Sequence, residues 1–107
     1  MSGSRTIIAD DEDRLPNVHP GEILREDLLI GSEVPAEEVA SGSGIPVARV
    51  EALLDERAAI DAEIDLRLAH YFGMSEGFFL GLQHDYELEE ARDAHRDALA
   101  KIVRRAA

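Results

Sequence analysis

The sequence predicts an all-α protein built around one hydrophobic core. Apolar residues recur at helical spacing along most of the chain, and residues that start and stop helices flank these segments. No segment has the alternating pattern of a strand. The length of 107 residues suits one domain with a tail and is too short for an enzyme with a cleft between two domains.

Composition narrows the class of protein further. Apolar residues make up 45% of the chain and charged residues 32%, as in folded domains that live in water. Apolar runs are only a few residues long, so we expect no membrane span and no secretion signal, and a cytoplasmic location. The absence of cysteine excludes disulfides, thiol catalysis and cysteine-ligated metal sites.

The chain is strongly acidic. It has 11 Lys and Arg against 23 Asp and Glu, which gives a formal net charge of −12. Residues 20–73 carry most of this excess, with 4 basic and 12 acidic side chains. Such a field repels nucleic acid at long range and favours a basic partner.

Three regions are expected along the chain. Residues 1–18 hold the acidic run 10–13 and are expected to form a flexible arm, because charge runs of this kind are usually solvated tails. Contact of this arm with a basic partner is the alternative. A helical domain follows at 19–90, and a C-terminal helix extension at 91–107.

The first two helices are marked by proline and glycine. Pro20 suits the first turn of a helix, and Gly31 is expected to end it. Pro35 opens a second short helix, which Gly42 and Gly44 end within about two turns. Because this helix is short and rich in glycine, packing must hold it in place.

Two further helices and a long final one complete the pattern. Pro46 starts the third helix, and Asp61 caps a fourth that stops at Gly73. The final helix is expected to open after Ser75 and to run to Val103. The apolar positions expected to face inward are Val50, Leu53, Leu54, Ile64, Leu66, Leu68, Ala69, Phe72, Phe78, Phe79, Leu82 and Tyr86.

The end of the chain has two features of its own. Small residues form a stripe along the last helix that lets another helix approach closely, so this face either folds back on the domain or contacts a second copy. The stripe consists of Ala91, Ala94, Ala98 and Ile102. The basic residues Lys101, Arg104 and Arg105 suit a helix C-terminus, and contact with nucleic acid is the alternative.

The second and third helices have the spacing of a helix-turn-helix. Gly44 suits the left-handed turn between them, and the small Ala40 lets the helices cross closely. An apolar wedge fixes their angle, and it consists of Val39, Ile45, Val50 and Leu53. A plain helical bundle is the alternative that this pattern leaves open.

Flanking motifs carry a resemblance to a known family. They are HPGEIL at 19–24, LRLA at 66–69, FGMS at 72–75 and FFLGLQ at 78–83, with Tyr86 and Leu88 behind them. Over about residues 18–90 the chain resembles the HigA/VapI-type antitoxins, lambda-repressor-like (Xre family) helix-turn-helix regulators that partner ribonuclease toxins. The resemblance implies a five-helix lambda-repressor-like domain with an extended C-terminal helix. It also implies a homodimer that binds its own operator and neutralises a toxin.

The resemblance further implies that the third helix enters the major groove of operator double-stranded DNA. The residues expected at DNA are Val47, Ala48, Arg49, Glu51, Ala52 and Arg57. The family usually has more polar and basic residues here. The resemblance therefore implies the fold more strongly than it implies DNA recognition. Other departures are Gly42 and Ser43, where Ala or Arg and then Leu are usual, and Phe79 in place of Trp.

Two functions follow from these observations. The first is an operator-binding antitoxin that represses its own operon by steric occlusion. The second is an acidic protein-interaction module that kept the fold, lost DNA affinity and masks a basic partner such as a ribonuclease toxin. Enzymatic activity, a cofactor and a metal are not expected, because neither a catalytic triad nor a phosphate-binding glycine loop is visible and the histidines lack metal-ligand spacing.

Overall fold

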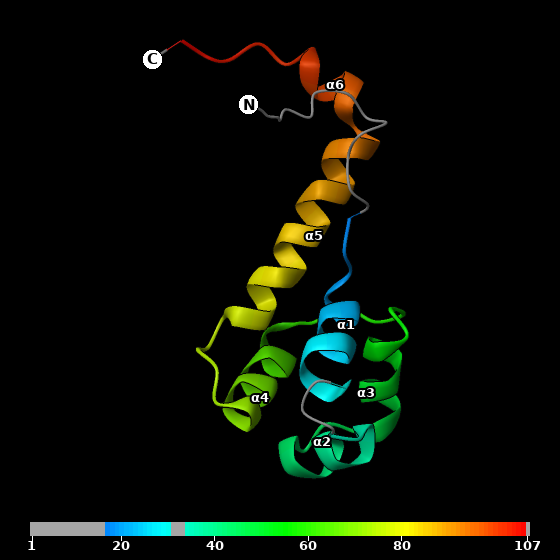
Figure 1. The fold of residues 1–107 in the computed structure, drawn as a ribbon. Helices are drawn as coiled ribbons and strands as arrows, with labels where there is room; N and C mark the ends of the chain where they lie inside the picture. The colour runs from blue at the N-terminus through cyan, green and yellow to red at the C-terminus, as the bar shows by residue number, and fades with distance from the viewer. Residues whose placement is uncertain (1–16, 31–33, 107) are drawn as a thin grey trace, which may run out of the picture.

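The computed structural model describes residues 17–30 and 34–106 of the chain. Its helices are α1 (Pro20–Ile23), a π-helical continuation η2 (Leu24–Ile30), α2 (Ala36–Ser43), α3 (Val47–Leu54), α4 (Ala62–Phe72), α5 (Phe78–Ala94) and α6 (Arg96–Ala100). The described ranges contain no strand, which confirms the predicted all-α class (Figure 1). Both the predicted arm, up to residue 16, and the predicted stop at Gly31 lie outside the described residues.

The helices α1 to α4 gather into one body, from which α5 projects (Figure 1). The first half of α5 packs against α1 and α4, while its second half leaves the body and leads to α6 at the far end. The principal-axis extents of 49 × 37 × 24 Å reflect this projection. None of the helices within 17–30 and 34–106 is long and apolar enough to cross a membrane.

The start of the first helix is confirmed and is fixed against α5. Pro20 occupies the first turn, and the Nδ1 atom of His19 accepts a hydrogen bond from the backbone N–H of Gly21 at 2.9 Å. This bond satisfies one of the N–H groups that a helix start leaves unpaired. The ring of His19 also meets the ring of Tyr86 edge-on, with centroids 4.8 Å apart.

The helix-turn-helix prediction is confirmed in its details. The four wedge residues lie in the core, and none is more than 2% exposed: Val39, Ile45, Val50 and Leu53. Gly44 adopts a φ of 77° and ends α2 in the left-handed conformation that the turn requires. The predicted cap of α4 is also present, because a carboxylate oxygen of Asp61 accepts from the N–H of Ile64 at 2.9 Å. Gly73, with a φ of 72°, ends α4 as expected.

Two residues expected in the core lie at the surface instead. Leu66 is 43% exposed, because it lies about 200° around α4 from the buried Ile64. Phe78 is 41% exposed and occupies the first position of α5, while its neighbour Phe79 is buried.

Buried polar side chains that the sequence pattern did not reveal position α5. The carboxylate of Asp65 accepts hydrogen bonds from the N–H groups of Gly77 at 2.7 Å and Leu80 at 2.8 Å. Asp65, a residue of α4, therefore caps the start of α5. The sequence pattern predicts only that this helix opens after Ser75. The buried Gln83 accepts from the N–H of Ile60 at 2.9 Å and so ties α5 to the segment before α4.

The prediction of one helix reaching Val103 is wrong. Helix α5 ends at Ala94, α6 ends at Ala100, and Val103 is 90% exposed outside any helix. All described residues from 91 onward are exposed, so no packing holds a longer helix together. The small-residue stripe accordingly does not fold back on the domain.

Candidate nucleic-acid interface

Helix α3 presents an outward face beside the helix-turn-helix turn. Pro46 precedes its first residue, and Val50 and Leu53 anchor its inner face in the core. Five of the six predicted DNA-contacting residues are exposed: Val47, Ala48, Arg49, Glu51 and Arg57. Ala52, the sixth, is half-buried.

Helical spacing brings four of these residues to one surface. Positions three and four apart on a helix lie on the same face, which groups Val47 with Glu51 and Ala48 with both Glu51 and Ala52. Arg49 lies on the flank of this face, and Arg57 lies beyond the end of α3. The site is thus a small apolar surface with one acid, and arginines lie at its edges.

Arg49 is held by a carboxylate of the next helix. Its Nη2 atom lies 3.5 Å from Oδ2 of Asp61, while the other oxygen of Asp61 caps α4. Both side chains are substantially exposed, at 43% and 62%. The pair therefore contributes little to the stability of the fold, yet it places a negative charge beside a cation expected to meet phosphate.

Arg57 has a similar neighbour within its own turn. Its Nη2 atom lies 3.2 Å from Oδ2 of Asp55. Between them, Glu56 adopts a φ of 63°, which is a left-handed conformation that costs free energy for any residue with a Cβ. A glycine would adopt this conformation without that cost.

The other two arginines of the body are also paired. Arg25 lies 3.2 Å from Glu26 and 3.4 Å from Glu56, and it donates to the carbonyl of Leu54. Its hydrogen bond with Glu26, with a smaller contribution from Glu56, raises the pKa of the Arg25 guanidinium above its ordinary value. All four arginines of the described residues between 20 and 73 therefore lie against carboxylates.

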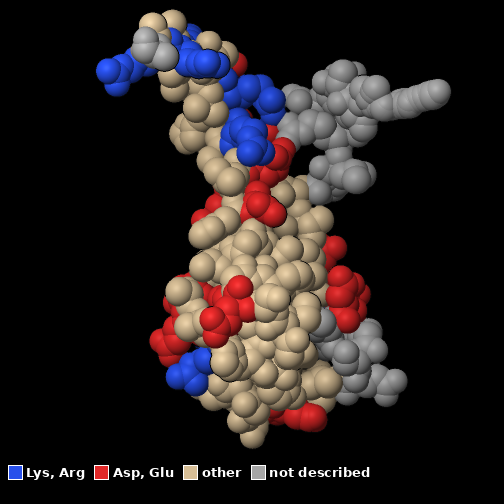
Figure 2. Space-filling model, turned by 90° about the vertical axis from the view of Figure 1, so that its left-hand side faces the viewer, with Lys and Arg blue, Asp and Glu red and all other residues tan. Residues whose placement is uncertain are grey.

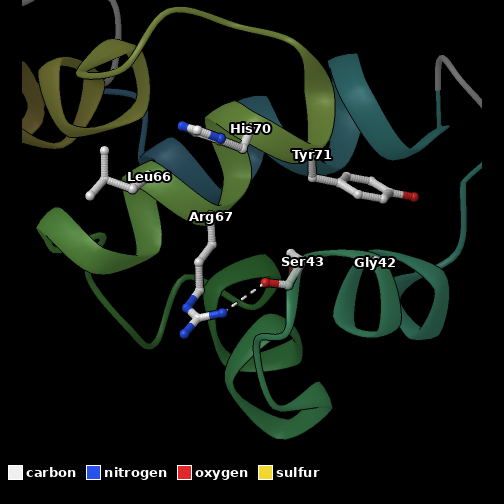
Figure 3. A pocket seen from close by; sticks show the side chains of 6 residues that line it. All are labelled: Gly42, Ser43, Leu66, Arg67, His70 and Tyr71. Carbon is white, nitrogen blue, oxygen red and sulfur yellow. Dashed lines mark hydrogen bonds between the residues drawn. The ribbon is translucent and has the colours of Figure 1, made fainter.

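Arg67 has a structural role at the end of α2. Its Nη1 atom donates to the carbonyl of Ser43 at 3.1 Å (Figure 3). Its Nε atom lies 3.0 Å from Oε2 of Glu63. A cation at this position satisfies a carbonyl that the helix end leaves unpaired and complements the helix dipole. These contacts give Arg67 a role in the fold.

The two departures in α2, Gly42 and Ser43, line a hollow between α2 and α4 (Figure 3). The hollow has a volume of about 380 Å³ and is lined by Gly42, Ser43, Leu66, Arg67, His70 and Tyr71. A Cβ at position 42 would fall 2.2 Å from Cε1 of Tyr71, so glycine lets the ring lie against α2. The Oγ atom of Ser43 donates to the carbonyl of Val39 at 2.6 Å, and the wedge stays intact.

Charge is distributed unevenly over the surface. Figure 2 shows acidic side chains on the body, and most of the basic side chains on that face gather at the end that carries α6. Within the described ranges, no three His, Asp or Glu side chains are placed to hold a metal ion. The fold, the left-handed turn at Gly44 and the outward face of α3 define a helix-turn-helix protein with an acidic body.

Known proteins place this helix-turn-helix domain in a family. The chain is 34% identical over 80 residues to virulence-associated protein I of Dichelobacter nodosus, a match that covers 75% of this chain and 74% of that protein. It is 35% identical to an addiction module antidote protein of a HigA family from Coxiella burnetii, with a TM-score of 0.78. That match covers 86% of this chain and all of the other. No protein-family model matches the sequence.

A third relative was solved with DNA. The antitoxin HigA of Pseudomonas aeruginosa, in a structure with the higBA promoter, is 27% identical, with a TM-score of 0.78 over 86% of this chain and all of that chain. The chain therefore belongs to the HigA/VapI-type family of lambda-repressor-like helix-turn-helix antitoxins, as the motifs at 19–24 and 78–83 indicated. The names of these relatives describe antitoxins rather than enzymes.

Proposed function

We propose that this protein is a DNA-binding antitoxin that represses its own operon by placing α3 in the major groove of the operator. The observation that carries this proposal is the exposed face of α3, which the helix-turn-helix holds rigidly above the core. The P. aeruginosa relative that was solved with its promoter supports the same function. Repression is then steric, because a protein on the operator excludes the polymerase.

In this proposal, mostly small side chains recognise the bases. Val47 and Ala48 are placed to meet thymine methyl groups, and Glu51 to accept a hydrogen bond from the amino group of cytosine. Ala52 lets the helix backbone lie close to the bases. Arg49 and Arg57 flank this surface, where phosphates run along the groove.

The protein acts as a homodimer in this proposal, so that two copies of α3 meet half-sites about 34 Å apart. Two copies supply four arginines at the groove, and each phosphate contact contributes about 0.9 to the salt slope of log K. The slope expected from these contacts is therefore about 3.6, which is shallow for a specific DNA-binding protein. The proposal needs neither a cofactor nor a catalytic residue, and it places the protein in the cytoplasm with its operator.

A second function is favoured by the ion pairs. All four body arginines of residues 20–73 are held by carboxylates, and the surface around them is acidic. Such a surface fits a basic protein better than it fits DNA, and a basic ribonuclease toxin is the partner that we propose for it. The tagged chain is expected to retain a basic protein from a lysate of the source organism. If it retains none, this second function is contradicted.

The test of DNA binding is fluorescence anisotropy with the DNA upstream of the gene and with scrambled DNA, at two salt concentrations. Tighter binding to the upstream DNA is the expected result. The double variant Arg49→Ala with Arg57→Ala is expected to lose this binding at physiological salt. The variant Arg92→Ala with Arg96→Ala removes the same charge far from α3 and serves as the control. Binding that survives the first pair of changes contradicts the site assignment.

A further inference from the structure

The C-terminal end of the chain forms an exposed basic arm, which we define as residues 91–106. It carries five basic and two acidic residues, a net charge of +3 in a protein whose total is −12. Every residue of the arm is exposed, and the arm lies at the opposite end of the molecule from α2 (Figure 1). Figure 2 shows the blue side chains gathered there. The arm therefore contrasts with the body in both charge and shape.

The cations at the tip of the basic arm have no carboxylate partner among the described residues. Arg92 and Arg96 pair with Glu89 and Asp93 on their own side of the helix. Lys101, Arg104 and Arg105 make no ion pair with any residue in the ranges that the structure describes. Between these cations lie Ile102 and Val103, which are 70% and 90% exposed. An occupant that is both acidic and apolar fits such a surface.

The N-terminal part of the chain enters beside this arm. The side-chain N–H₂ group of Asn17 donates to the carbonyl of Tyr86 at 2.9 Å and to Oε2 of Glu90 at 3.1 Å. Followed backward from Pro20, residues 17–19 run beside α5 in the direction of its C-terminal end (Figure 1). Asn17 therefore lies about one helical turn from the beginning of the basic arm.

Residues 7–13 have the composition that the arm requires. Their sequence is IIADDED, in which two isoleucines and an alanine precede four consecutive acidic residues. The segment contains no basic residue. The acidic run lies four to seven residues before Asn17, which an extended chain spans in about 14–25 Å. Arg96 and Lys101 follow Glu90 by six and eleven residues, across the break between α5 and α6 at His95, so Lys101 lies no farther than about 20 Å from Glu90. The acidic run is thus long enough to reach the start of α6 and Lys101.

We propose that residues 7–13 dock on the basic arm of the same chain. Their carboxylates pair with Lys101, Arg104 and Arg105, and their isoleucines cover Ile102 and Val103. Each exposed pair favours the docked form by about twofold to fivefold, which offsets part of the cost of ordering the segment. The contact hides this basic end of an acidic protein from nucleic acid and from the acidic body of a second copy.

Paramagnetic relaxation in NMR spectra tests this contact on the full chain. The protein has no cysteine, so Thr6→Cys gives a single attachment point for a nitroxide just before the docking segment. At about 0.01 M salt, where screening extends over about 30 Å, we expect at least a twofold loss of amide signal intensity at residues 98–106. A nitroxide at Glu37→Cys, on α2 in the body, is the control and is expected to leave these signals sharp.

Neutral variants and mixed samples separate the outcomes. The change of residues 10–13 to DDED→NNQN and, separately, a salt concentration of about 1 M are each expected to restore the signals, because the contact is electrostatic. Sharp signals at low salt overturn the proposal, as does broadening that the neutral variant retains. Broadening in a mixture of ¹⁵N-labelled chain without nitroxide and unlabelled chain with nitroxide also overturns it, because the contact then lies between copies.

Discussion

Gly21 lies directly against the backbone of Leu53, since a Cβ at position 21 would fall 1.9 Å from the carbonyl oxygen of Leu53. This contact joins the start of α1 to the end of α3. The helix that we propose for DNA reading is therefore held by a glycine in the motif at 19–24. Close packing, rather than any special backbone angle, is the reason for glycine here.

The first prediction concerns this contact. Gly21→Ala forces the two helices apart and is expected to lower the free energy of unfolding by about 1–3 kcal/mol. Gly81→Ala is the matched control, because a Cβ at position 81 meets nothing within 4 Å. Alanine inside α5 is expected to stabilise the protein by about 0.5–1 kcal/mol. Urea unfolding followed by circular dichroism measures both, and a fully stable Gly21→Ala variant contradicts the contact.

The second prediction concerns the left-handed turn at Glu56. Glu56→Gly relieves the strain of a φ of 63° but loses the ion pair with Arg25. Glu56→Gln loses the same charge and keeps the strain, so it is the proper reference. We expect the glycine variant to be more stable than the glutamine variant by about 1 kcal/mol, measured by thermal and urea unfolding. Equal stability of the two variants means that the turn is not strained.

The third prediction concerns the buried cap of α5. Asp65→Ala leaves the N–H groups of Gly77 and Leu80 without an acceptor, and it is expected to cost about 1–3 kcal/mol of stability. Asp65→Asn keeps one acceptor oxygen and is expected to cost less. Glu63→Ala, on the exposed side of α4, is the control and is expected to change stability little. Unfolding of the three variants in urea checks this order.

The helix ends could be predicted because their causes are local. Pro20, Gly44 and Gly73 act through their own backbone angles, and Asp61 reaches only three residues ahead. By contrast, the hydrogen bonds by which Asp65 caps α5 join residues at least 12 positions apart in the sequence. Composition does not reveal hydrogen bonds over such a separation. Local patterns likewise predicted a helix as far as Val103, since they do not show whether anything packs against it.

The candidate site also has features that the sequence predicted and features that it did not. The outward position of Val47, Ala48 and Glu51 followed from helical spacing and from the buried residues beside them. The ion pairs of Arg49 and Arg57 did not, because they depend on how side chains meet across a turn. These pairs bear on DNA affinity, which makes them the part of the site that most needs a direct test.

The last prediction tests whether Asp61 restrains Arg49. Asn is as good an N-cap residue as Asp, so Asp61→Asn keeps α4 capped while it removes the charge that holds the guanidinium. If α3 binds the operator, the freed Arg49 is expected to tighten binding by about twofold to fivefold. Anisotropy at two salt concentrations measures this gain.

Three controls make the result specific to the pair. Asp85→Asn removes an exposed charge on α5 and is expected to leave affinity nearly unchanged. Asp61→Ala loses the cap and is expected to cost about 1 kcal/mol of stability, which the asparagine variant does not lose. In the double variant Arg49→Ala with Asp61→Asn, the gain should disappear relative to Arg49→Ala alone, because the released side chain is absent. A gain that persists without Arg49 means that Asp61 repels the DNA directly and does not act through the arginine.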